Sequence, residues 1–269
     1  MSDTFSGHYP IERRAGEIER LHIQSAAFAR DVEVMLDLIG VGEGWSCVDL
    51  GCGPGGITEP MSRRAGRTGR VIGLDKDAQF LEHARAHAPA NVEFRQGDAY
   101  ASDLPEASFD LVHMRFLAGT AGGPERLIRE AIRLCRPGGV VALQEPDCDT
   151  LNCYPPHPAW EKLKRAVVGV FDSVGGDVHL GQRLYRLVRQ MGLADVHYRP
   201  VLIGVRSIDP MVDYLPATVE SLRGTITRLG LLSDEEFPLI LAEARRHLQK
   251  PDTVFTLYTV AQVWGRKPR

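Results

Sequence analysis

The residues best suited to chemistry stand in one short glycine-rich segment. Residues 48–56 read VDLGCGPGG, an apolar run that passes directly into glycines. Gly51 and Gly53 tolerate backbone angles that a side chain would forbid, and they leave no Cβ between the chain and a ligand. Asp49 stands two residues before the first of them, where it would repel a pyrophosphate but attract an ammonium group. This spacing indicates a nucleotide-like cofactor that carries a positive charge.

A second acid follows at the distance expected for a ribose contact. The apolar run 70–74 ends in Asp75, about twenty residues beyond the loop, where an adenosyl ribose would present its two hydroxyls. The two features together favour an adenosine joined to an amino-acid part, as in S-adenosylmethionine. The alternative is a strand and a tight turn that bind nothing.

These residues need elements that bring them together. Apolar and helical segments alternate, with strands expected near 46–50, 70–74, 92–95, 109–114 and 139–145. Such alternation is typical of parallel βαβ units, whose ligands bind beyond the carboxyl ends of the strands. The polar residues at these ends are Asp49, Asp75, Asp98, Arg115 and Glu145. We therefore expect them to share one crevice.

The motifs, taken in order, resemble those of the class I S-adenosylmethionine-dependent methyltransferases. The matching segments are VDLGCGPGG (48–56), VIGLDKD (71–77), QGDA (96–99), FDLVHMR (109–115) and LCRPGGVVA (134–142). The chain is similar to the small-molecule branch that serves quinone and natural-product biosynthesis. The resemblance implies an α/β, Rossmann-like, doubly wound fold, with a mostly parallel seven-stranded sheet, an antiparallel last strand and a helical lid.

The resemblance also implies one domain over 1–269. Its expected parts are an N-terminal helical cap (1–40), a cofactor-binding core (41–146), a substrate lid with sheet continuation (147–230), and a C-terminal helix and strand (231–269). Periodicity predicts two helices within 11–40, helices at 160–174, 181–191, 209–228 and 233–248, and strands at 196–205 and 253–264. Ser233 and Glu236 form a capping-box pattern.

The cofactor-binding residues implied by the resemblance come from several of these segments. They are Asp49, Gly51, Gly53, Asp75, Lys76, Gly97, Asp98, Ala99, Arg115 and Gln24. Tyr9 and His22 are further candidates for pocket contacts in the N-terminal cap. The alternative for the cap is a helix packed on the sheet edge with its polar groups in solvent.

Methyl transfer from a sulfonium is an in-line displacement, so positioning of the two reactants supplies much of the rate. His113 and Glu145 are the candidate catalytic residues, since either could accept a proton. The alternatives are a histidine held inside a strand and an acid in a polar turn. Asp147, Asp149 and Asn152 form an oxygen-rich group, which we interpret as solvated, so no metal is expected.

Composition limits the partners. The 269 residues are 43% hydrophobic and 25% charged, with a net charge of −3, which gives no general attraction to nucleic acid. No apolar run could span a bilayer and no signal peptide is recognisable, so we expect a cytoplasmic protein with a small-molecule substrate. A homodimer is left open. The five cysteines lack disulfide or zinc spacing and are expected to be reduced and buried, although Cys148 and Cys153 could bridge.

The predicted function is transfer of a methyl group from S-adenosylmethionine to a small molecule, in secondary metabolism or quinone-like biosynthesis. Oxygen is the first choice of accepting atom, then carbon, then nitrogen. Three alternatives stay open: an enzyme of this fold that binds the cofactor but catalyses cyclisation or decarboxylation, a nicotinamide-dependent dehydrogenase, and a non-catalytic binding protein.

Overall fold

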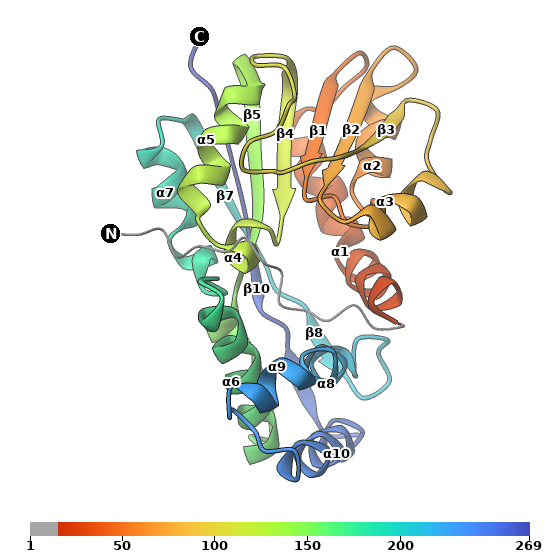
Figure 1. Cartoon of the computed structure of the whole chain (residues 1–269), viewed down its shortest axis with the longest axis vertical. Coiled ribbons are helices and arrows are strands. Elements are labelled where there is room, and N and C mark those ends of the chain that lie inside the picture. The colour runs from red at the N-terminus through yellow and green to blue at the C-terminus, as the bar shows by residue number, and fades with distance from the viewer. Residues whose placement is uncertain (1–15) are drawn as a thin grey trace.

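A seven-stranded sheet forms the centre of the molecule (Figure 1). The structure is a computed structural model that describes residues 16–269. The order of the strands is β3-β2-β1-β4-β5-β10-β7, and β10 runs antiparallel to both of its neighbours. This topology confirms the expected sheet, including its antiparallel last strand. The strands are β1 (Ser46–Leu50), β2 (Arg70–Asp75), β3 (Val92–Gln96), β4 (Phe109–Arg115), β5 (Cys135–Asp147), β7 (Ala194–Val201) and β10 (Thr259–Arg266).

Helices cover both faces of the sheet because its strands are apolar on both sides. Val48 and Leu50 of β1 face the cluster that α5 and α7 complete, whereas Cys47 faces the cluster of α1 and α2. The helix α3 packs on β2 and β3. The covering helices are α1 (Glu17–Ile39), α2 (Thr58–Ala65), α3 (Ala78–Arg85), the short α4 (Ala118–Ala121), α5 (Pro124–Leu134) and α7 (Leu184–Gln190).

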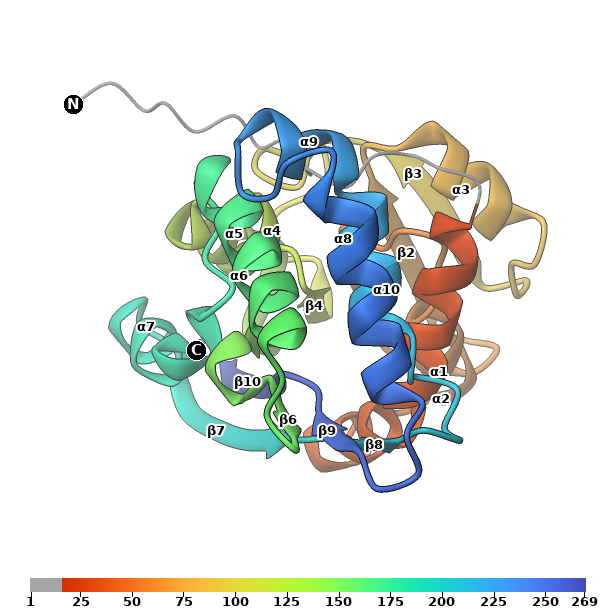
Figure 2. The ribbon, with the colours of Figure 1, turned by 90° about the horizontal axis from the view of Figure 1, so that it is seen from below.

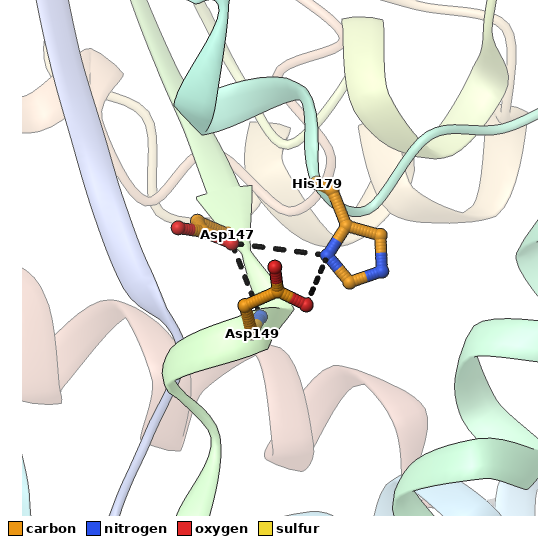
Figure 3. A group of neighbouring side chains, drawn as sticks. All are labelled: Asp147, Asp149 and His179. Carbon is orange, nitrogen blue, oxygen red and sulfur yellow. Dashed lines mark hydrogen bonds and ion pairs between the residues drawn. The ribbon is translucent and has the colours of Figure 1, made fainter.

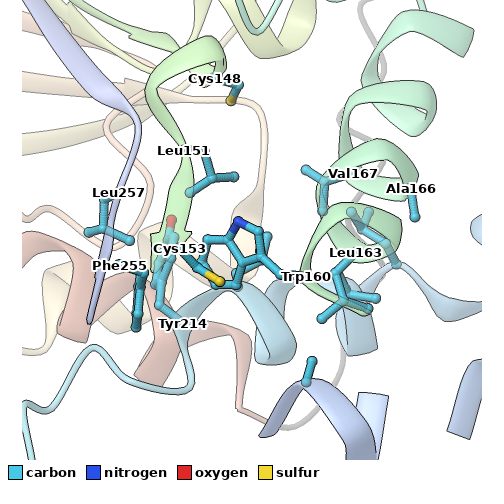
Figure 4. Packing of buried hydrophobic residues seen from close by; sticks show 14 of the residues in the cluster. Cys148, Leu151, Cys153, Trp160, Leu163, Ala166, Val167, Tyr214, Phe255 and Leu257 are labelled. Carbon is cyan, nitrogen blue, oxygen red and sulfur yellow. The ribbon is translucent and has the colours of Figure 1, made fainter. Parts of the chain in front are cut away.

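A second layer lies beyond the carboxyl ends of the central strands, and we call it the lid (Figures 1 and 2). Its helices surround a hydrophobic cluster in which Trp160 is 1% exposed (Figure 4). A small sheet of order β6-β9-β8 extends it. The lid contains α6 (Pro158–Ser173), α8 (Tyr214–Ser221), α9 (Arg223–Arg228), α10 (Glu236–Leu248), β6 (Asn152–Tyr154), β8 (Gly204–Arg206) and β9 (Val254–Thr256), and the 3-10 turns are η1 (Cys148–Thr150) and η2 (Leu180–Gln182).

Some predicted boundaries were wrong. One continuous helix, α1, replaces the two helices expected before the first strand, as far as residues 16–40 are described. The strands expected at 196–205 and 253–264 each divide in two. The chain passes from the large sheet to the small one at residues 202–203, and it returns from the small sheet to the large one at residues 257–258. The helix expected at 209–228 divides at Leu222, which takes φ −104° and ψ 5°.

Local predictions for the helix caps and cysteines are confirmed. Ser233 N–H donates to Glu236 Oε2, and Glu236 N–H donates to Ser233 Oγ at 3.0 Å, so the capping box opens α10. All five cysteines are free and buried. Among the described helices, none combines the length and the apolarity needed to cross a bilayer.

Candidate functional site

A cavity of about 960 Å³ lies between the carboxyl ends of the central strands and the lid. Its walls come from α1, from the ends of β1, β2 and β4, and from the lid. All ten residues that the sequence assigned to the cofactor lie along it, and so do Ser25 and Gly56. Tyr9 lies outside the described residues, and His22 is exposed and does not line the cavity.

The glycine-rich loop after β1 is pinned to the end of β2. Gly51 N–H and Cys52 N–H both donate to Leu74 O, at 2.8 and 3.0 Å. Asp75 Oδ2 accepts from Gly53 N–H at 2.8 Å, and its Oδ1 accepts from Asp77 N–H at 2.8 Å. Burial raises the pKa of Asp75 in spite of these bonds. Each carboxylate oxygen keeps a further lone pair for a ligand hydroxyl.

The two loop glycines take left-handed backbone angles, with φ of 70° at Gly51 and 52° at Gly53. A Cβ added to Gly53 would have no protein atom within 4 Å, although the residue lines the cavity. The space above Gly53 is therefore open toward the cavity. This geometry leaves room for the close approach of a ligand to the backbone, which stays a prediction of the sequence.

Asp49 is 3% exposed and is paired with His113. The carboxylate accepts from His113 Nδ1 at 2.7 Å, and Gln144 Nε2 lies 2.9 Å from His113 Nε2. An amide nitrogen can only donate, so His113 Nε2 accepts and the proton is on Nδ1. Both ring nitrogens of this fully buried histidine are thus engaged, and the residue does not line the cavity.

The pair is one end of a row of polar side chains inside the sheet, which we call the polar ladder. Gln262 Nε2 donates to Gln144 Oε1 at 2.9 Å, and Arg199 Nη1 donates to Gln262 Oε1 at 2.8 Å. Arg199 also pairs with Asp31 of α1 at 2.6 Å. The ladder therefore crosses β1, β4, β5, β10 and β7, and each hydrogen bond between these strands is donated toward Asp49.

Arg115 places a cation beside the loop. Its Nη2 donates to Ser25 Oγ of α1 at 2.7 Å, and no carboxylate of the described residues lies within ion-pair distance of it. A Cβ added to Gly56 would meet the same nitrogen at 3.5 Å. Burial lowers the pKa of Arg115, while the charge of Asp49 opposes that shift. An anionic group of a ligand would supply a counter-charge for the Arg115 guanidinium.

Glu145 is fully buried and holds the chain after β4. Its oxygens accept from Ala118 N–H at 2.9 Å and from Gly119 N–H at 3.0 Å. Burial raises the pKa of Glu145 to about 8. The residue does not line the cavity, so the structure brings neither Glu145 nor His113 into contact with that space.

Four polar residues of the cavity wall form a cluster, and the sequence singled out only one of them, Gln24. Gln24 and Arg20 of α1 reach Tyr214 of α8, and Tyr258 joins them from the link between β9 and β10. Tyr258 sits in an alternating apolar pattern that carries no functional signal, and Tyr214 opens an ordinary amphipathic helix. Only a structure could bring these segments together.

Asp147, Asp149 and His179 gather at the end of β5 (Figure 3). His179 Nδ1 lies 3.2 Å from Asp149 Oδ1, and Gln182 Nε2 donates to both carboxylates. The neighbours Pro146, Cys148 and Val178 line the cavity, whereas the three residues of the cluster do not. Asn152, expected in this group, donates to the Asp149 carbonyl instead.

Comparison with known proteins gives a consistent set of similarities. The sequence model of a family described as "Methyltransferase domain" matches residues 47–139. The chain is 32% identical over 198 residues to the trans-aconitate 2-methyltransferase of Azoarcus sp. (strain BH72), and the alignment covers 72% of this chain and 74% of that protein. It is 37% identical over 132 residues to the demethylmenaquinone methyltransferase of Lactococcus lactis, and that alignment covers 47% of this chain and 50% of the relative.

A solved structure resembles the whole fold. The YcgJ protein from Bacillus subtilis superposes with a TM-score of 0.61 at 18% identity, covering 90% of this chain and 99% of that one. At this identity the likeness concerns the fold alone. The chain spans about half the length of several curated relatives that it matches.

Proposed function

The chain belongs to the class I S-adenosylmethionine-dependent methyltransferases, and we propose that its acceptor is a small molecule of secondary metabolism or quinone-like biosynthesis. The observation that carries the proposal is the cavity itself, where ten predicted cofactor residues meet an apolar lid. Its volume of about 960 Å³ lies near the upper end of the range for small-molecule sites, about 300–1,000 Å³. A cofactor and a second reactant both find room there.

The residues fit the cofactor at four points. The open space above Gly53 admits a ligand close to the backbone, and the remaining lone pairs of Asp75 suit the two ribose hydroxyls. Asp49 offers a carboxylate to the ammonium group of the amino-acid part. Arg115 offers its cation to the carboxylate of the same part, since it has no acidic partner among residues 16–269.

S-adenosylmethionine, when bound, supplies an electrophilic methyl group on a sulfonium. The contribution of the chain is to orient both reactants and to exclude water. The apolar side chains of the lid, including Leu151 and Phe171, line the acceptor half of the cavity. These apolar side chains favour an acceptor with a largely apolar body, although Thr218, Thr225 and Arg228 of the lid also line the cavity.

We assign His113 and Glu145 positioning roles in this reaction. His113 holds Asp49 through a 2.7 Å hydrogen bond and fixes the direction of its free oxygen. Glu145 holds the backbone of Ala118 and Gly119 next to the lining residues Leu117 and Thr120. Substitution of either residue should change the affinity for the cofactor or the shape of the cavity, with no loss of a proton acceptor at the reacting atoms.

The test is product formation with candidate acceptors. Purified protein is incubated with methyl-labelled S-adenosylmethionine and with trans-aconitate, demethylmenaquinol or a panel of phenols, and S-adenosylhomocysteine is measured. We expect labelled acceptor and S-adenosylhomocysteine in equal amounts. The Gly53→Ala variant serves as control, because it should lose both together. Absence of binding of S-adenosylhomocysteine in calorimetry, or tighter binding of NAD, would overturn the proposal.

Loss of an acceptor without S-adenosylhomocysteine formation would instead point to a cyclisation or decarboxylation on the same fold. That outcome would retain the cofactor site and remove the methyl transfer. The product analysis therefore separates the alternatives that the sequence left open.

A further inference from the structure

The cluster of Arg20, Gln24, Tyr214 and Tyr258 stands where α1 meets the lid, and all four residues line the cavity. Arg20 is held by Glu17, with Arg20 Nη2 at 2.7 Å from Glu17 Oε1. The donor and the acceptor of each hydrogen bond in this cluster can be assigned, because an amide nitrogen and a guanidinium only donate. The assignment shows which atom, if any, accepts each tyrosine proton.

The oxygen of Tyr214 is saturated as an acceptor. It receives one hydrogen bond from Gln24 Nε2 and another from Arg20 Nη1, the latter at 3.1 Å. A phenol oxygen has two lone pairs, and both are thus used. Tyr214 therefore donates in its 2.9 Å contact with the hydroxyl of Tyr258.

Tyr258 is then left with an unused proton. Its oxygen accepts from Tyr214 and, at 2.9 Å, from Gln24 Nε2. Among residues 16–269 no acceptor is within reach of the Tyr258 hydroxyl besides these saturated partners. Burial raises the pKa of Tyr258 well above its ordinary value, so the hydroxyl keeps its proton at neutral pH.

The surroundings of Tyr258 belong to the lid side of the cavity. Its ring makes an edge contact with Phe116 at 5.6 Å and lies 6.3 Å from Phe28, measured between ring centroids. Tyr258 packs against the hydrophobic cluster of the lid, of which Leu151, Phe171 and Leu215 also line the cavity. Apolar side chains thus adjoin a hydroxyl whose proton has no acceptor among residues 16–269, and such a donor selects a polar atom on a largely apolar ligand.

We propose that the Tyr258 hydroxyl donates a hydrogen bond to a carbonyl, phenolate or carboxylate oxygen of the methyl acceptor, whose remaining body lies against the apolar lid. This inference rests on the proposed function and names the class of its acceptor. Tyr258 thereby acts as a specificity-determining residue. It orients the acceptor by an oxygen, which need not be the atom that receives the methyl group.

The experiment compares Tyr258→Phe with the wild type and with Tyr214→Phe, which removes a hydroxyl from the same cluster but leaves the Tyr258 proton in place. Protein saturated with S-adenosylhomocysteine is titrated with 2-naphthoate and with 2-methylnaphthalene, which lacks the oxygens. For Tyr258→Phe we expect 2-naphthoate to bind about 10-fold more weakly or worse, because the lost bond is to a charged group. Affinity for 2-methylnaphthalene should stay within twofold, and Tyr214→Phe should weaken 2-naphthoate far less.

The titration with S-adenosylhomocysteine tests whether the oxygen that accepts the hydrogen bond from Tyr258 belongs to the cofactor or to the methyl acceptor. Unchanged affinity in Tyr258→Phe supports the proposal and shows that the cavity is still folded. A tenfold loss of that affinity would mean that the Tyr258 hydroxyl donates to the carboxylate of the cofactor, and it would overturn the proposal. Equal weakening of both naphthalene probes, or no binding of 2-naphthoate to the wild type, would overturn it too. None of these results affects the proposed methyl transfer, which fails only if the cofactor does not bind or no S-adenosylhomocysteine forms.

Discussion

Replacing Gly53 by alanine tests whether the loop after β1 is a cofactor cradle. An added Cβ meets no protein atom within 4 Å, so the new methyl group points into the cavity where we place the cofactor. Overpacking a closely fitted site costs about 1–3 kcal/mol. The dissociation constant of S-adenosylhomocysteine should therefore rise about 5- to 150-fold.

Gly192→Ala is the matched control for this change. Gly192 follows α7 with φ of 91°, and an added Cβ there also meets nothing within 4 Å. It is exposed and is not among the residues that line the cavity. Both substitutions carry the cost of a left-handed backbone, about 1–2 kcal/mol, so the two variants should lose similar stability.

Calorimetric titration with S-adenosylhomocysteine and chemical denaturation of both variants make the comparison. Only Gly53→Ala should lose affinity, whereas both should shift the denaturation midpoint. Wild-type affinity in Gly53→Ala would refute the reasoning, because it would mean that no ligand atom approaches this backbone. Equal losses of affinity in the two variants would refute it as well, since backbone strain alone would then explain them.

Three other substitutions test single contacts. Asp75→Asn turns one acceptor into a donor opposite Gly53 N–H, so calorimetry should show S-adenosylhomocysteine affinity falling about 10- to 150-fold; a change below threefold would contradict the ribose role. The pKa of Glu145 is about 8 in the folded protein against an ordinary 4.5, so the folded state holds a proton that the unfolded state has released. The contribution of the Glu145 carboxyl to the free energy of unfolding is fully present below pH 4.5. It falls as the pH rises to about 8, by up to about 1.4 kcal/mol per pH unit. Denaturation of Glu145→Gln between pH 6 and 8 should show a flatter profile than the wild type, and parallel profiles would exclude this carboxyl as the cause. Gln144→Leu leaves His113 Nε2 without a partner inside the sheet, whereas Gln262 Nε2 keeps Asp31 O as an acceptor, so the free energy of unfolding should drop by about 1–3 kcal/mol; a loss below about 0.5 kcal/mol in urea denaturation would speak against a continuous ladder.

The gathering of residues at the proposed cofactor half of the cavity could be predicted from the sequence because these residues follow consecutive strands. Parallel strands end at one edge of a sheet, so Asp49, Asp75 and Asp98 had to meet once the alternation was recognised. The face on which His113 lies needed the structure. Strand periodicity gives alternate sides but does not say which side carries which helices.

The residues of the proposed acceptor half could not be predicted, for a topological reason. Tyr258 and Tyr214 come from segments far from Gln24 in the chain, and each sits in an unremarkable periodic pattern. The breaks at 202–203 and 257–258 were missed because a strand that passes from one sheet to another keeps its period of two.

The place of β10 has a consequence for biosynthesis. β10 lies between β5 and β7, and β7 has no other neighbour in the large sheet. On the ribosome, β5 and β7 are made before β10, so the strand edges that pair with β10 stay unpaired until the segment from α8 to α10 has been translated. Unpaired strand edges are the sites at which chains associate wrongly. Completion of the sheet is thus a late event, and a nascent chain stopped short of residue 259 would expose both edges to its neighbours.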